Sequence, residues 1–199
     1  MSVFAALGAY VHHRDPTTRL ANTIALMVGL NGPFYPLYLW WIVPEVGQLA
    51  LATMAVSPGF LAIPWLARRH AALARLMLPG LGLANTAWTL ALLGPGAGVG
   101  AFVYPCILLA GLCWREPMAM LGVLAAGFAA QLGALYWPAL ALSGLEPSEQ
   151  MKLMPLNASS VAALLCFMVF SCARQLADAE DRQNQDQSGK VGHPPTLAR

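Results

Sequence analysis

The sequence predicts an all-α membrane protein, a polytopic bundle of six transmembrane helices with both termini in the cytoplasm. Hydrophobic residues make up 58% of the 199 residues and charged residues only 10%, whereas a soluble domain carries about 25% charged residues. In addition, six apolar stretches approach the roughly 20 residues that a helix needs to cross the hydrocarbon core of a bilayer. This composition excludes a soluble enzyme, a nucleic-acid-binding protein and a disordered chain.

The predicted spans follow one another with short connections. They cover residues 20–43, 47–67, 73–93, 99–114, 118–142 and 155–173. The fourth is the shortest and contains Pro105. Apolar and polar residues do not alternate within these runs, so helices are expected rather than the strands of a barrel. Because the connections are short, neighbouring helices are expected to be antiparallel.

The chain outside the spans forms two shorter segments. Residues 1–19 are predicted to be cytoplasmic, with a short helix on the membrane surface as one interpretation of the apolar start. No cleaved signal peptide is evident there, because the start lacks basic residues. Residues 20–174 are predicted to form the transmembrane domain. Residues 175–199 are polar and end with glycine and proline, which predicts a mostly disordered cytoplasmic tail.

The orientation follows from the basic residues, which are enriched on the cytoplasmic side of membrane proteins. If the N-terminus is cytoplasmic, only Lys152 of the 11 lysine and arginine residues falls outside. The basic residues then predicted to lie inside are Arg14, Arg19, Arg68, Arg69, Arg75, Arg115, Arg174, Arg182, Lys190 and Arg199. This one-sided distribution favours six spans with both termini inside.

Charged and metal-binding side chains are placed unfavourably for chemistry within the membrane. No ionisable side chain falls near the middle of a predicted span, which disfavours a proton-coupled transporter, a pump and an intramembrane metalloprotease. The 4 histidines lie in predicted cytoplasmic segments, so haem ligation within the bundle is not expected. The cysteines lie in apolar helices without a CxxC spacing: Cys106, Cys113, Cys166 and Cys172. We therefore predict no enzyme, no metal site and no cofactor.

A ligand-binding recess is predicted where the first span is interrupted. Pro33 and Pro36 each remove a backbone donor, and the carbonyl groups they free need new partners or face a cavity. A plain kink near the membrane edge is the alternative, and hydrogen bonds between helices are the alternative role for amides and hydroxyls in the spans. The predicted ligand-binding residues are Asn31, Tyr35, Tyr38, Asn85, Trp88 and Tyr104.

Small residues recur along the predicted fifth span. Such residues allow two helices to approach closely, so this span is expected to pack tightly inside the bundle or to form a dimer contact. The residues concerned are Gly122, Ala126, Ala130 and Gly133.

Three short motifs, in this order, carry a resemblance to a known family. They are Arg68-Arg69-His70 followed by Ala74-Arg75-Leu76, Leu93-Gly94-Pro95-Gly96-Ala97-Gly98 before Phe102-Val103-Tyr104-Pro105, and Leu156-Asn157-Ala158 opening a span that leads into residues 173–180. Over residues 20–181 the chain resembles the six-span membrane sensor domain at the N-terminus of bacterial histidine kinases, diguanylate cyclases and adenylate cyclases.

The resemblance implies a sensory or regulatory module in the bacterial inner membrane. It implies that the last span continues as a signalling helix, with output through Arg174, Leu176 and Glu180. The chain departs from the family after Arg182, where no catalytic domain follows. We therefore expect either a sensor region excised from a longer protein or a stand-alone relative that acts through a partner. The expected partners are the lipid bilayer and a second copy or a signalling protein, without nucleic acid.

Two other functions are consistent with the same sequence. A transporter or channel for a small neutral solute would require a continuous polar path across the membrane. A structural subunit of a membrane complex would require fixed partner proteins and no ligand of its own.

Overall fold

The described part of the chain is helical. The computed structural model describes residues 2–113, 117–136 and 142–191, which contain helices and no strand. The α-helices are α1 (Val3–Val11), α2 (Pro16–Asn31), α3 (Tyr35–Ile42), α4 (Leu49–Ala52), α5 (Ser57–Ala67), α6 (Ala71–Leu93), α7 (Val103–Cys113), α8 (Pro117–Tyr136) and α9 (Pro147–Val191). The 3-10 helices are η1 (Gly32–Phe34), η2 (Pro44–Val46), η3 (Pro95–Ala97) and η4 (Val99–Phe102). The predicted all-α class is confirmed for these residues.

Three helical stretches in the described residues are long and apolar enough to cross a membrane. They are Leu49–Ala67, Ala71–Leu93 and Pro147–Arg174, with 19, 23 and 28 residues. A further apolar stretch, Val99–Cys113, is shorter than the length that a crossing usually requires. These helices support a membrane protein, whereas the number of six spans stays a prediction.

The predicted first span, 20–43, consists of more than one helix. Helix α2 begins at Pro16, ahead of the predicted start, because the Asp15 carboxylate accepts a hydrogen bond from the backbone N–H of Thr18 at 3.0 Å. Pro16 occupies the first helical position, where no backbone donor is needed. After Asn31 the chain tightens into η1 around Pro33 and continues as α3. The interruption predicted at Pro33 is therefore present.

The last helix is longer than its predicted span, 155–173. The chain begins α9 at Pro147, where the Glu149 carboxylate accepts a hydrogen bond from the backbone N–H of Glu146 at 3.0 Å. Helix α9 then continues to Val191, although the sequence predicts a mostly disordered tail from residue 175. The polar composition of this segment cannot distinguish a solvated helix from disorder, and it contains many good helix formers such as alanine, glutamine and arginine.

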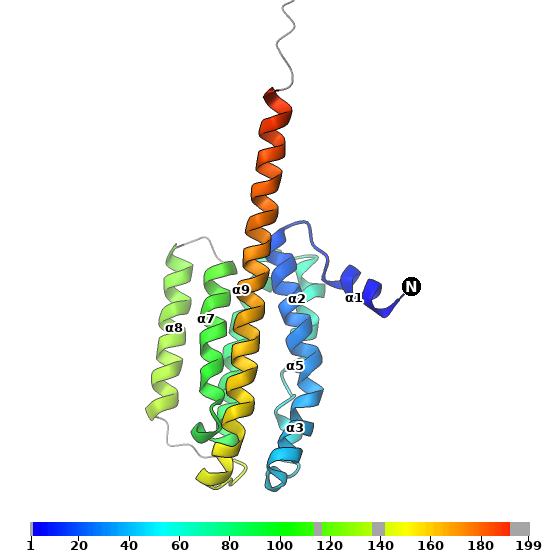
Figure 1. The fold of residues 1–199 in the computed structure, drawn as a ribbon. Coiled ribbons are helices and arrows are strands. Elements are labelled where there is room, and N and C mark those ends of the chain that lie inside the picture. Colours follow the sequence, from blue (N-terminus) through cyan, green and yellow to red (C-terminus); the bar gives the residue numbers. More distant parts are fainter. Residues whose placement is uncertain (1, 114–116, 137–141, 192–199) are drawn as a thin grey trace, which may run out of the picture.

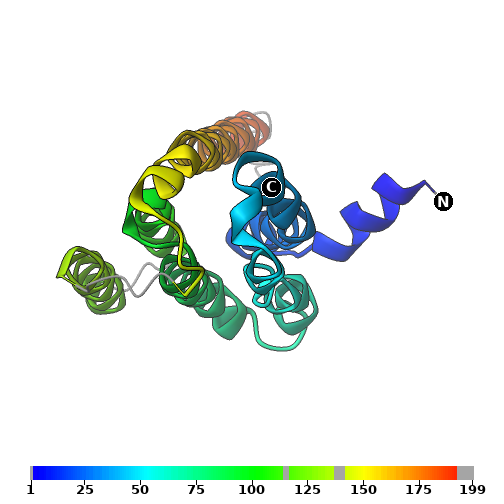
Figure 2. The same ribbon diagram turned by 90° about the horizontal axis from the view of Figure 1, so that it is seen from below.

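The long helices form a bundle in which successive members alternate in direction. Helices α2, α5, α6, α7, α8 and α9 lie along a common axis (Figure 1). Seen along that axis, α8 lies outside, next to α7 (Figure 2). Helix α1 extends away from the bundle near the end from which α9 emerges (Figure 1). This arrangement agrees with the antiparallel neighbours that the short connections predict.

Two buried clusters occupy the two ends of the bundle. Near the start of α2, Leu20, Ile63 and Leu78 pack with Met168 of α9. Near the end of α6, residues of α3, η2 and η3 pack with Leu153 at the start of α9. We call these the basic-end core and the acidic-end core, because the charged side chains divide between the same two ends.

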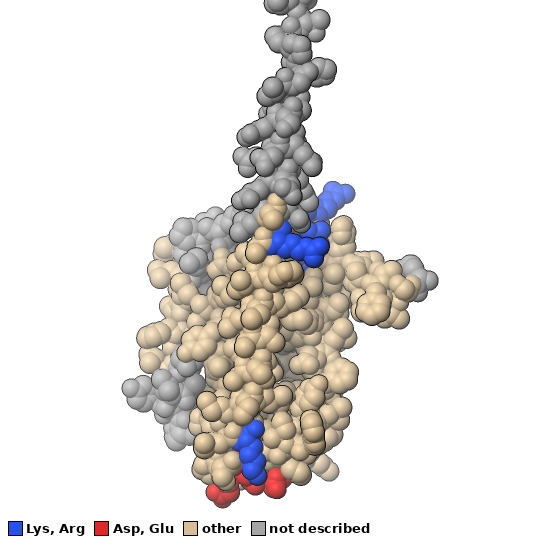
Figure 3. All heavy atoms as spheres, viewed as in Figure 1, with Lys and Arg blue, Asp and Glu red and all other residues tan. Residues whose placement is uncertain are grey.

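The charges separate clearly in a surface view. Basic side chains gather at the end from which α9 emerges, and acidic side chains with one basic region mark the opposite end (Figure 3). At the first end lie the starts of α2 and α6 and the end of α5, and at the second lie η2 and the start of α9. The described charged residues at the first end are Arg14, Arg19, Arg68, Arg69, Arg75 and Arg174 with one carboxylate, Asp15, and those at the second end are Glu45, Glu146, Glu149 and Lys152. The side chains of Arg115, Arg182, Lys190 and Arg199 lie outside the described part of the chain.

Glycines allow close contacts between helices at specific positions. A methyl group on Gly32 would lie 1.8 Å from Ser57 Oγ, so η1 and α5 touch there. One on Gly82 would lie 2.6 Å from Cys106 Sγ, which brings α6 against α7. A β-carbon does not approach another heavy atom so closely, so a larger residue at either position would force its neighbour to shift.

Helix α8 meets α7 at a small residue outside the predicted packing set of Gly122, Ala126, Ala130 and Gly133. Gly122 and Ala126 line a shallow hollow that α8 shares with α6. A methyl group on Gly122 would meet no atom within 4 Å, and Ala126 is exposed. A methyl group on Gly127, in contrast, would lie 2.6 Å from Ile107 of α7. Small residues occupy several faces of α8, and their spacing does not show which face meets α7. The surroundings of the other two predicted residues lie outside the described part.

Candidate functional site

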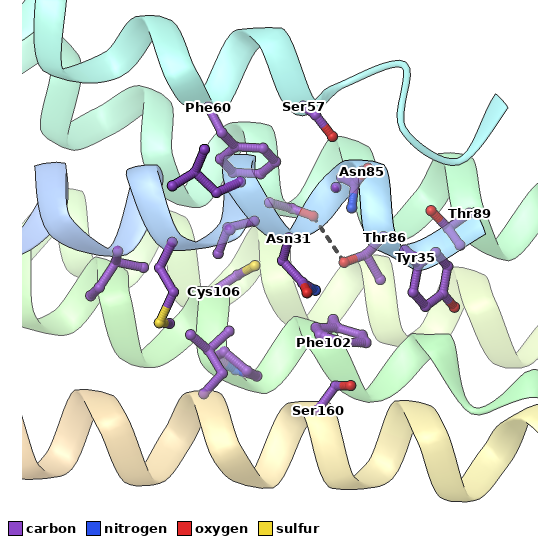
Figure 4. Close-up of a pocket in the computed structure, with 18 of the residues that line it drawn as sticks. Asn31, Tyr35, Ser57, Phe60, Asn85, Thr86, Thr89, Phe102, Cys106 and Ser160 are labelled. Atoms are coloured by element: carbon purple, nitrogen blue, oxygen red, sulfur yellow. Dashed lines mark hydrogen bonds between the residues drawn. The ribbon is translucent and has the colours of Figure 1, made fainter. Parts of the chain in front are cut away.

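A cavity of about 580 Å³ lies between the basic-end and acidic-end cores. Its walls come from α2, the start of α3, α5, α6, α7 and α9, from the turns η1 and η4, and from Thr53 between α4 and α5 (Figure 4). The lining is mainly apolar, with aromatic rings from Phe60, Phe102 and Phe167, and no charged residue is among the described residues that line it. Its volume is in the range of about 300–1,000 Å³ that is usual for sites that bind small organic molecules.

Several polar side chains in the wall are satisfied by their own helices or turns. The Thr53 hydroxyl donates to the Ala50 carbonyl at 2.6 Å. The Thr86 hydroxyl donates to the Gly82 carbonyl at 2.8 Å (Figure 4), and Ser160 donates in the same way to a carbonyl in the preceding turn of α9. Such local bonds leave little capacity for a ligand.

Two carboxamides in the wall differ from the hydroxyls of Thr53, Thr86 and Ser160. Asn31 ends α2 and Asn85 lies within α6, and both line the cavity (Figure 4). Within the described part of the chain, neither side chain has a hydrogen-bond partner. A carboxamide offers two donor hydrogens and an acceptor oxygen, so both side chains are available to a polar group placed in the cavity.

A third wall residue, Tyr35, connects the cavity to α9. Its hydroxyl donates to Asn157 Oδ1 at 2.8 Å, and Asn157 Nδ2 donates to the Ala97 carbonyl at 2.8 Å. Asn157 is fully buried. These bonds join α3, α9 and η3 at one point, and they join two of the motifs on which the family resemblance depends, residues 93–98 and 156–158. We call this chain of hydrogen bonds the Asn157 relay.

The same end of α9 holds the glycine-rich turn through a second side chain. Gln150 accepts a hydrogen bond from the Gly96 backbone N–H at 3.1 Å and donates to the Leu145 carbonyl at 2.9 Å. Gly94 adopts φ +88°, and a methyl group there would lie 2.4 Å from Gln150 Oε1. The turn therefore needs glycine for conformation and for space, and α9 is fixed at this end.

The structure brings together Asn31, Tyr35 and Asn85 from the predicted ligand-binding set. The other three lie outside the lining. Tyr38, Trp88 and Tyr104 are 40%, 39% and 54% exposed, and the Trp88 indole donates instead to the Ala52 carbonyl at 2.7 Å. These aromatic residues point to the outside of the bundle, a position that suits rings with an apolar body and a polar tip.

Other wall residues are not among the predicted ligand-binding set. Thr89 lies one helical turn after Asn85, so the polar face of α6 is visible in the sequence as positions four apart. Ser57, Phe102 and Phe167 carry no comparable signal, because hydroxyls and aromatic rings are common on every face of membrane helices.

A separate group of polar residues fixes the basic end. The Asp15 carboxylate, at the start of α2, forms a 2.8 Å ion pair with Arg75 of α6. Partial burial raises the pKa of Asp15, but hydrogen bonds from Thr18 and the charge of Arg75 outweigh this effect, so its pKa lies below the usual 3.8. The Arg68 guanidinium stacks on the Tyr10 ring at 5.5 Å, which attaches α1 to the bundle.

The described residues contain no group of three or more histidine, cysteine, aspartate or glutamate side chains able to hold a metal ion. The four cysteines are unpaired, and of these Cys106 lines the cavity. Of the predicted output residues, Arg174 is exposed on α9, while Leu176 and Glu180 belong to the same helix but their side chains lie outside the described part.

Comparison with known proteins adds no family assignment. No protein-family model matches the sequence, and no curated protein matches it.

Proposed function

We propose that this protein is a non-enzymatic sensory or regulatory module of a membrane. A small uncharged ligand occupies the cavity and displaces α9, and this displacement is transmitted to a partner. The observation that carries the proposal is the double role of α9. Its residues Ser160, Leu164 and Phe167 line the cavity, and the same helix continues to Val191, beyond the bundle (Figure 1).

The contacts of α9 suggest how ligand binding would move it. One end is fixed by Gln150 and by the Asn157 relay. A ligand packed against Leu164 and Phe167 would displace the part of α9 that follows the fixed end. This displacement would increase towards Arg174 and residues 175–191, which extend beyond the bundle. A ligand can shift the helix only if it binds one helix arrangement more tightly than another.

The resemblance to the membrane sensor domains of bacterial kinases and cyclases supports the same proposal. In that setting the protein spans the bacterial inner membrane six times, and its basic end faces the cytoplasm, following the bias of basic residues. The projecting end of α9 would then meet its partner in the cytoplasm, either a second copy of the chain or a signalling protein.

Hydrogen–deuterium exchange of the full chain in lipid nanodiscs tests this function, with decan-1-ol as an uncharged probe. We expect the probe to change exchange at cavity-lining amides and also at amides 174–191 in α9. Exchange that changes at the cavity but stays the same in 174–191 would contradict the proposed role of α9.

A transport assay tests the main competing function. In liposomes that contain the protein, glycerol flux is expected to equal the flux of protein-free liposomes, because the described cavity carries only a few polar groups and no polar path through both cores. Glycerol flux that requires the protein, and that stops when decan-1-ol occupies the cavity, would favour a neutral-solute channel. This result would overturn the sensory proposal.

A further inference from the structure

The chemical class of the ligand can be inferred from the opening and the lining of the cavity, and this inference rests on the proposed binding role of that cavity. Among the lining residues, the large side chains of Met27, Leu30 and Phe34 are 37%, 44% and 54% exposed. They lie on α2 and η1, and Ala163 on α9 is a further lining residue that is exposed. The cavity therefore opens sideways, between α2 and α9, rather than at an end of the bundle.

The opening lies at the depth of the membrane interior. Ser160 and Ala163 are close to the middle of the 28-residue apolar stretch Pro147–Arg174. Because a helix rises about 1.5 Å per residue, the middle of such a stretch lies about 20 Å from either end. In a bilayer with a hydrocarbon core of about 30 Å, this opening faces lipid chains. A ligand would reach the cavity from the bilayer and not from water.

The polar groups at the cavity are suited to an uncharged oxygen. The free carboxamides of Asn31 and Asn85 offer donors and acceptors but no charge. None of the described lining residues could neutralise a carboxylate or an ammonium group. A charged head would therefore be buried without a partner, which is costly in an apolar site. A hydroxyl or carbonyl head would be satisfied.

We propose that the cavity binds an uncharged amphiphile taken from the bilayer, with a hydroxyl or carbonyl head at Asn31 and Asn85. The apolar body of the molecule packs against Phe60, Phe102 and Phe167. Alcohols, ketones and related neutral lipids belong to this class, whereas fatty acid anions and alkyl ammonium ions do not.

The test measures thermal unfolding of the full chain in lipid nanodiscs with probes that differ only in their head group. Decan-1-ol is expected to raise Tm by about 5–10 °C at a concentration about 100-fold above its Kd. Decane, which lacks a head group, is expected to bind about 2- to 10-fold more weakly. Decane-1-sulfonate and decyltrimethylammonium are expected to give no rise.

Matched variants separate binding in the cavity from a general effect of the probe on the bilayer. Asn31→Leu and Asn85→Leu are each expected to weaken decan-1-ol binding about 2- to 10-fold, while Tyr104→Phe, outside the lining, leaves it unchanged. Ala163→Trp is expected to block the opening and abolish the Tm rise. Ala162→Trp, an exposed neighbour on α9 that does not line the cavity, keeps it.

Equal stabilisation by charged and uncharged probes, or unchanged decan-1-ol affinity in both asparagine variants, would overturn this inference. Loss of the Tm rise in Ala162→Trp and Ala163→Trp alike would overturn the sideways opening. The two proposals fail separately. Decan-1-ol that binds in the cavity without altering α9 contradicts only the sensory function, and a response of α9 to a charged probe bound in the cavity contradicts only the ligand class.

Discussion

Single polar side chains connect the parts of this bundle that lie far apart in the sequence. Asp15 joins the start of α2 to α6 through Arg75, and Asn157 joins α9 to α3 and η3. In each case the bond also satisfies a group that is partly or fully buried, so its loss leaves an unpaired partner. The consequences can be measured one residue at a time.

Asp15 contributes to stability as a helix cap and as an ion-pair partner, and two substitutions separate these roles. Asp15→Ala removes both and is expected to destabilise the protein by about 0.5–2 kcal/mol. Asp15→Asn keeps a capping oxygen and is expected to cost only the ion pair, about 0.2–1 kcal/mol because both side chains are partly exposed. Thermal unfolding in detergent micelles measures the loss of stability in each variant. Equal losses of stability in the two variants would show that the cap does not contribute to the stability of the protein.

The pH dependence of stability follows from the same residue. Because the pKa of Asp15 is lower in the folded chain than its usual 3.8, the ionised form stabilises the fold at neutral pH. This contribution is present above about pH 4 and disappears as the pH falls through the folded pKa. Unfolding measured from pH 6 to pH 2 should show a loss of stability that is smaller in Asp15→Asn. Parallel curves for the two proteins would contradict this prediction.

The Asn157 relay is tested by removing its donor. Tyr35→Phe leaves Asn157 Oδ1 buried without a hydrogen bond and is expected to destabilise the protein by about 1–3 kcal/mol. Tyr38→Phe is the control, since Tyr38 is 40% exposed and its change is expected to stay within about 0.5 kcal/mol. Indistinguishable unfolding of the two variants would show that the relay does not hold α9.

At the scale of the element, packing depends on where small residues meet large neighbours. Gly32→Ala would place a methyl group against Ser57 and force η1 away from α5, and we expect a loss of about 1–3 kcal/mol. Gly80→Ala, on α6 with no atom within 4 Å, is expected to be neutral or to stabilise by about 0.4–1 kcal/mol. Thermal unfolding of the two variants measures these changes in stability.

The double variant Gly32→Ala/Ser57→Gly provides the control for this contact. It removes the obstructing side chain and is expected to recover much of the stability lost in Gly32→Ala. Failure to recover any stability would show that the contact between η1 and α5 is not the cause of the loss.

The sequence predicts helices better than it predicts which helix faces meet. Long apolar runs specify helices because a bilayer accepts few other structures, and prolines mark the interruption at η1. The rotation of each helix depends on its neighbours, so the predicted ligand-binding set contains residues that line the cavity, Asn31, Tyr35 and Asn85, and residues that lie outside its lining, Tyr38, Trp88 and Tyr104. In the same way, hydropathy identifies α8 but not the contact at Gly127.

At the scale of the whole molecule, the separation of charge predicts which end of the bundle faces the cytoplasm. Single cysteines that replace Arg69 and Lys152, in a chain whose native cysteines are alanine, report the two ends. We expect an impermeant maleimide to label Lys152→Cys in intact cells and Arg69→Cys only after the membrane is opened. Labelling of both positions from the same side would contradict the proposed path of the chain.

Occupancy of the cavity is expected to move residues 175–191 of α9, which extend beyond the bundle. Spin labels at Arg69→Cys, just after the end of α5, and at Ala177→Cys, on α9, in the chain whose native cysteines are alanine, measure this movement by double electron–electron resonance in nanodiscs. We expect decan-1-ol to shift the distance distribution in the labelled protein, and to leave it unchanged when Ala163→Trp blocks the cavity. An identical distribution with and without decan-1-ol, under conditions where the probe raises Tm, would contradict the account.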